Sequence, residues 1–73
     1  MKVNITKETT EKFWHWFNEV GDAVSNILLF ATEEERRCLM LDCNGKASEF
    51  GWAEYVCNNM PQLAERIVRA TES

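Results

Sequence analysis

The chain has 73 residues, of which 45% are hydrophobic and 27% are charged, so its length allows one globular domain and no more. Eight basic and twelve acidic residues give a net charge of −4. This balance argues against a nucleic acid or an anionic membrane as the main partner, because phosphate binding depends on Lys and Arg. No apolar stretch approaches the roughly 20 residues that span a bilayer.

The three cysteines, Cys38, Cys43 and Cys57, are odd in number and contain no Cys-x-x-Cys pair. The N-terminus lacks the basic and apolar regions of a signal peptide, so we expect reduced thiols and a cytoplasmic protein. Cysteines beside Leu, Met and Val are typical of small core side chains. With a single distant histidine, they predict neither a metal site nor a cofactor.

Residues 1–5 are expected to form a short extended arm or an edge strand, because Val3 and Ile5 alternate with polar residues. Thr6 is a suitable N-cap for the helix that follows. That helix is predicted to be long and amphipathic and to cover 7–31, since its apolar residues recur at spacings of three and four.

The aromatic run 13–17 is the most distinctive part of the predicted helix. Its four aromatic side chains fall within an arc of about 160°, and His15 alone points away from them. Trp14 and Trp16 lie at the margins of the apolar face, where a side chain can be half in a core and half in a partner. Gly21, near the edge of that face, predicts a close helix approach or a weak point that costs up to about 1 kcal/mol relative to Ala.

Thr-Glu-Glu-Glu at 32–35 is a capping box, with Thr32 as N-cap and Glu35 at the third helical position. It predicts a helix over 33–42. Residues 38–41 are apolar without a clear period, so a short buried strand is the alternative there. The well-formed cap favours the helix.

Two more short helices complete the predicted fold. Asn44-Gly45-Lys46 is expected to form a turn, and Ser48 is expected to cap a helix over 49–58. Pro61 suits the first turn of a last helix over 62–71. One side of the 49–58 helix, expected to be buried, carries Phe50, Ala53, Val56, Cys57 and Met60, with Trp52 and Tyr55 further round. The sequence thus predicts an all-α single domain over 1–73, a compact bundle of one long N-terminal amphipathic helix and three shorter helices.

No constellation of residues indicates catalysis. A nucleophile needs a base within reach, and His15, the one histidine, lies on an exposed face beside Glu11 and Glu19. The chain also lacks a Gly-rich phosphate loop. We therefore expect that it is not an enzyme.

Two arginine pairs, Arg36-Arg37 and Arg66 with Arg69, have two interpretations. The simpler one is a solvated face that complements the many carboxylates. The more specific interpretation is an anion site for a phosphate, a nucleotide or an acidic partner, with a tryptophan as stacking surface. An oligomer that binds an anionic small molecule or nucleotide is accordingly the second functional hypothesis.

A helix-turn-helix is the third hypothesis, since 33–42, the turn and 49–58 have roughly that shape. The presumed recognition helix carries Glu49 and Glu54 and no Lys or Arg, which opposes binding to phosphates.

The leading hypothesis follows from the aromatic residues, which make up 11% of the chain. They are more than so small a core is expected to bury, so some should be partly exposed unless another chain covers them. It is a small acidic helical protein-binding module that acts as inhibitor, adaptor or regulator by occupying a partner's surface. We expect it to form a homodimer through the 7–31 helix. Compact proteins of this kind are common among phage and mobile-element factors. The side chains expected to contact the partner are Trp14, Trp16, Trp52 and Tyr55.

Overall fold

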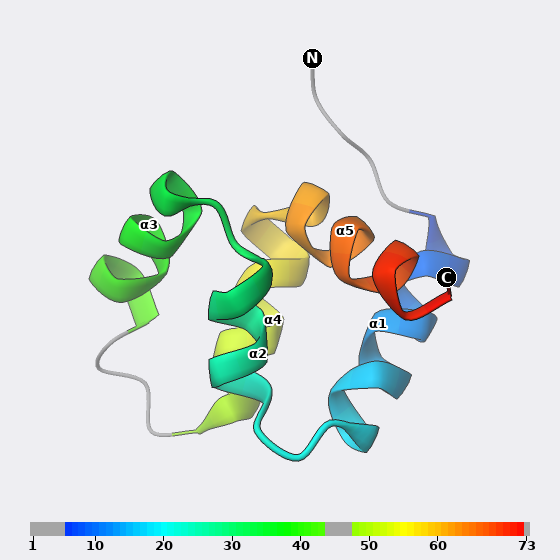
Figure 1. Ribbon diagram of the computed structural model, residues 1–73. Helices are drawn as coiled ribbons and strands as arrows, with labels where there is room; N and C mark the ends of the chain where they lie inside the picture. The colour runs from blue at the N-terminus through cyan, green and yellow to red at the C-terminus, as the bar shows by residue number, and fades with distance from the viewer. Residues whose placement is uncertain (1–5, 44–47, 73) are drawn as a thin grey trace.

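A computed structural model describes residues 6–43 and 48–72, which fold into five helices and contain no strand. The helices are α1 (Lys7–Glu19), α2 (Ala23–Phe30), α3 (Glu33–Cys43), α4 (Glu49–Asn59) and α5 (Pro61–Glu72). Helices α1 and α3 lie on opposite sides of the molecule, and α5 packs against α1, α2 and α4 (Figure 1). The all-α prediction is confirmed. The predicted arm over 1–5 and the turn over 44–46 lie outside the described residues.

The predicted long helix over 7–31 is wrong, because the chain leaves helical geometry between α1 and α2. Val20 ends α1 with an extended backbone, at φ −76° and ψ 137°. Asp22 then caps α2, and its carboxylate accepts a hydrogen bond from the Ser25 backbone N–H at 3.2 Å. Gly21 is a poor helix former and Asp favours the N-cap over the helix interior, so the local sequence opposes a continuous helix. The break lets α2 pack against α4 and α5.

A carboxylate from α4 stabilises the same break. Glu49 accepts hydrogen bonds from the backbone N–H groups of Ala23 at 2.9 Å and Val24 at 3.3 Å. These are first-turn donors of α2 that have no partner within their own helix. A negative group at the positive end of a helix is favourable, so α4 helps to fix where α2 begins.

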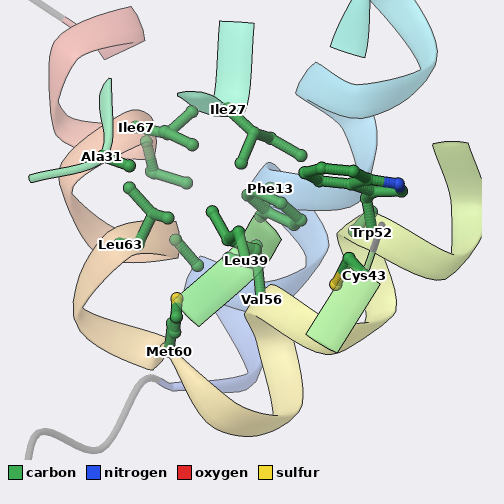
Figure 2. Packing of buried hydrophobic residues seen from close by; sticks show 13 residues of the cluster. Phe13, Ile27, Ala31, Leu39, Cys43, Trp52, Val56, Met60, Leu63 and Ile67 are labelled. Atoms are coloured by element: carbon green, nitrogen blue, oxygen red, sulfur yellow. The ribbon is translucent and has the colours of Figure 1, made fainter. Parts of the chain in front are cut away.

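All five helices contribute fully buried side chains to one core (Figure 2). Examples in chain order are Phe13, Ile27, Leu39, Val56 and Leu63, each with no exposed surface. Because α1 and α2 are separate helices, Phe13 and Ile27 reach this core from two different elements (Figure 2).

The capping box forms as predicted. The Thr32 backbone N–H donates to Glu35 at 2.9 Å, and the Glu35 backbone N–H donates to the Thr32 hydroxyl at 3.1 Å. Helix α3 runs through 38–41, so the helix prediction there is confirmed and the strand alternative is wrong. None of the helices in the described part of the chain is long and apolar enough to cross a membrane.

Candidate functional site

Three aromatic side chains form a continuous and partly exposed surface between α1 and α4. The Trp14 ring lies 5.1 Å from the Phe50 ring, tilted by 32°, and 5.5 Å from the Phe17 ring, edge to face. Phe50 is 55% exposed, whereas Trp14 and Phe17 are half-buried. We call Trp14, Phe17 and Phe50 the aromatic face.

The backbone fixes the position of each ring. Trp14 and Phe17 are three residues apart on α1, so they project from one side of the helix. Phe50 lies in the first turn of α4, which Ser48 caps by accepting from the Gly51 backbone N–H at 3.4 Å. Trp14 also makes an edge contact with Phe13, at 6.0 Å between ring centroids, and Phe13 is fully buried. The aromatic face is thus anchored to the core.

The prediction that Phe50 lies on the buried side of its helix is wrong. Helix α4 turns Trp52, Ala53 and Val56 inward, and Trp52 keeps only 8% of its surface exposed. Figure 2 shows the Trp52 indole among the buried side chains. Since a residue two positions earlier points about 200° away on a helix, Phe50 is directed out of the core that Trp52 enters.

Trp52 and Tyr55, two side chains predicted to contact a partner, make contacts within the fold. Trp52 belongs to the core, so it offers little surface to a partner. Tyr55 is half-buried, and its hydroxyl donates to the Asp42 carboxylate at 2.5 Å, which links α4 to α3. This hydrogen bond, with a smaller effect of burial, raises the pKa of Tyr55 to about 12.

Trp16 lies apart from the aromatic face. It packs on Phe13 with 5.5 Å between ring centroids and lines a groove between α1 and the end of α5. Of the four residues predicted to contact a partner, only Trp14 therefore belongs to the aromatic face, and Phe17 and Phe50 are the members that sequence reasoning missed. The sequence signal for Phe50 was its spacing of two positions from Trp52, which puts the two rings on opposite sides of one helix.

Arg66, predicted as an anion ligand, is already bonded within the chain. Its guanidinium donates to the Glu35 carboxylate at 2.7 Å and to the Phe30 carbonyl at 3.0 Å. Burial alone would raise the pKa of Glu35, but hydrogen bonds from Arg66, the Thr32 backbone and Gln62 outweigh it and lower that pKa to about 2. Arg66 thereby joins α5 to α3 and to the end of α2.

The other predicted anion ligands lie at separate places on the surface. Arg69 pairs with Glu65 at 2.9 Å, and Arg37 lies 3.9 Å from Glu33, each one turn away on its own helix. Exposed pairs of this kind contribute little to stability. Arg36 is exposed and lines a shallow groove of 340 Å³ with Leu28 and Leu29.

Among the described residues, the other large apolar side chains that are exposed are Leu29 on α2 and Met40 and Leu41 on α3. Leu29 keeps 76% of its surface exposed. Single exposed leucines are common on soluble proteins, whereas linked aromatic rings are typical of binding surfaces. The aromatic face is accordingly the stronger candidate site.

The cysteines and carboxylates form no further chemical centre in the described part of the chain, where no cluster of His, Cys, Asp and Glu could hold a metal. Burial raises the pKa of the Cys57 thiol to about 11, so this thiol is a weak nucleophile at neutral pH. Comparison of the chain with protein-family models, curated proteins and solved structures finds no match.

Proposed function

We propose that the protein is a small acidic protein-binding module whose aromatic face docks onto another protein. The observation that carries the proposal is the stack of Phe50 on Trp14 at 5.1 Å, with Phe50 more than half exposed. Aromatic side chains dominate the energetics of interfaces when they enter a pocket on the partner. Trp14 contacts the fully buried Phe13, so the aromatic face loses little conformational freedom on binding.

The mode of action that fits the aromatic face is to cover part of the partner's surface. The three members of the aromatic face carry no nucleophile and no titratable group, and they supply apolar area to a complex. A module of this kind acts as an inhibitor, an adaptor or a regulator according to what it covers on the partner. An apolar pocket or groove of the partner is the chemistry that accepts Phe50 and Trp14.

The alternatives have weaker support. An anion site would need arginine donors that are available, and the Arg66 guanidinium is bonded to Glu35 and Phe30. A helix-turn-helix would use α4 as its recognition helix, and α4 contains no Lys or Arg.

A homodimer through the same face is the second candidate. Trp14 and Phe17 lie on α1, and a chain of 73 residues gains stability from association because its own core is small. The aromatic face of one copy can pack against the same face of a second copy, since aromatic rings can pack against one another across a twofold axis.

The experiment that tests the proposal places a photo-crosslinking phenylalanine analogue at Phe50 in cells of the native host. A matched control carries the analogue at Leu29, which is also apolar and exposed but lies on α2. We expect a discrete adduct from position 50 and none from position 29. An adduct with a second copy of the chain would establish the homodimer, whereas adducts from position 29 alone would overturn both candidates.

A further inference from the structure

A groove of 570 Å³ lies between α1 and the C-terminal turn of α5, on a different part of the surface from the aromatic face. Figure 1 shows the end of α5 beside α1. His15, Trp16 and Thr71 line the groove, and carboxylates stand around it. Its volume lies within the range of sites that hold a side chain or a small ligand.

The Trp16 indole is the apolar wall of this groove. It is half-buried, and Phe13 supports it from the core at 5.5 Å between ring centroids with 34° between the ring planes. A tryptophan held in this way offers a fixed ring to the groove. Among aromatic rings, indole attracts cations most strongly, and guanidinium groups stack on it.

The charges around the groove are unbalanced. Lys12 is shared by Glu8 and Glu72, each at 3.1 Å from its ammonium group. Glu11 and Glu19 line the same groove and have no ion-pair partner among the described residues. The groove therefore presents two carboxylates whose charge the described part of the chain does not neutralise, beside a ring that favours cations.

We propose that this groove binds a basic segment of a protein partner, with an Arg or Lys side chain over Trp16 and its charge facing Glu11 and Glu19. Charge complementarity selects the occupant, because carboxylates hold a guanidinium through paired, charge-assisted hydrogen bonds. The proposal extends the proposed function, since it names the chemistry of a second contact. It does not depend on the aromatic face, so failure of one leaves the other to be judged separately.

The test is a titration of the isotope-labelled protein with an oligo-arginine peptide, followed by nuclear magnetic resonance at low and high salt. We expect saturable shifts at the Trp16 indole N–H and at the backbone of His15, Glu19 and Thr71, weakening as salt rises. A neutral glycine-serine peptide should give none. Shifts that are absent, or spread evenly over the acidic surface, would overturn the proposal.

Matched variants separate the groove from general acidity. E11Q/E19Q should weaken binding about fivefold, because two exposed charge pairs are lost. E34Q/E54Q removes the same charge from exposed positions on α3 and α4 and should change affinity less than about twofold. W16F keeps an aromatic side chain beside Phe13 and should also weaken binding. Equal effects of the two double variants would contradict the proposal.

Discussion

The carboxylate of Glu35 lies 2.7 Å from the Arg66 guanidinium and also accepts the backbone N–H of Thr32 at 2.9 Å. One side chain thus caps α3 and attaches it to α5. Glu35 is buried, with 10% of its side chain exposed. A buried carboxylate is stable only when its oxygens are satisfied, and Gln62 supplies a further donor at 3.0 Å.

The contribution of Glu35 to stability should disappear in acid. Its pKa falls from 4.5 to about 2 in the folded protein. A lowered pKa of this size corresponds to about 3 kcal/mol, fully present above the unfolded pKa and lost as the pH falls through the folded pKa. Urea unfolding of the wild type and of E35Q should therefore differ by about this amount at neutral pH and converge near pH 2.

The neighbouring E34Q variant is the control for that series, because Glu34 is exposed and forms no ion pair among the described residues. The free energy of unfolding of E34Q should stay close to that of the wild type at every pH. If the difference in the free energy of unfolding between the wild type and E35Q does not change with pH, the ionised form of Glu35 contributes nothing to stability.

Loss of the Glu49 carboxylate should destabilise α2, a helix other than its own. E49A removes the acceptor for the Ala23 and Val24 backbone N–H groups and should lower the free energy of unfolding by about 1 kcal/mol. Hydrogen exchange should accelerate at Ala23 and Val24 first. E54A, an exposed change on the same helix, should alter neither quantity; matching effects of both variants would show that Glu49 does not cap α2.

Gly21→Ala should stabilise the protein slightly. The φ angle of Gly21 lies outside the left-handed region, and an added Cβ would meet nothing within 4 Å. Alanine restricts the unfolded chain more than glycine does, so the free energy of unfolding should rise by about 0.5 kcal/mol. Thermal unfolding measures this change. A rise in helical circular dichroism would instead show that α1 and α2 merge, which the caps at Val20 and Asp22 oppose.

The sequence predicted the local parts of this fold well. The capping box at Thr32 and Glu35 depends on residues three apart, and both of its hydrogen bonds are present. The break after Glu19 was missed because the apolar period continues across it. Its local signal was Asp22 three residues before Ser25, but the carboxylate that completes the cap comes from Glu49, at a distance that a sequence pattern does not reveal.

The candidate surfaces were harder to predict for the same reason. Both Trp52 and Phe50 are large and apolar, and only the packing of α4 against its neighbours decides which of them is buried. The engagement of Arg66 by Glu35 joins residues 31 positions apart. Pattern analysis could name Trp14 as a margin residue of its helix, but the ring that stacks on it comes from another element.

The most direct test of the aromatic face measures the affinity of the purified partner, identified through the position-50 adduct, for the wild type, F50A and L29A. We expect F50A to weaken binding at least about tenfold, since an anchor aromatic contributes more than about 1.4 kcal/mol. L29A should bind like the wild type, and circular dichroism should show that both variants stay folded. Unchanged affinity of a folded F50A would contradict a role for the aromatic face in binding.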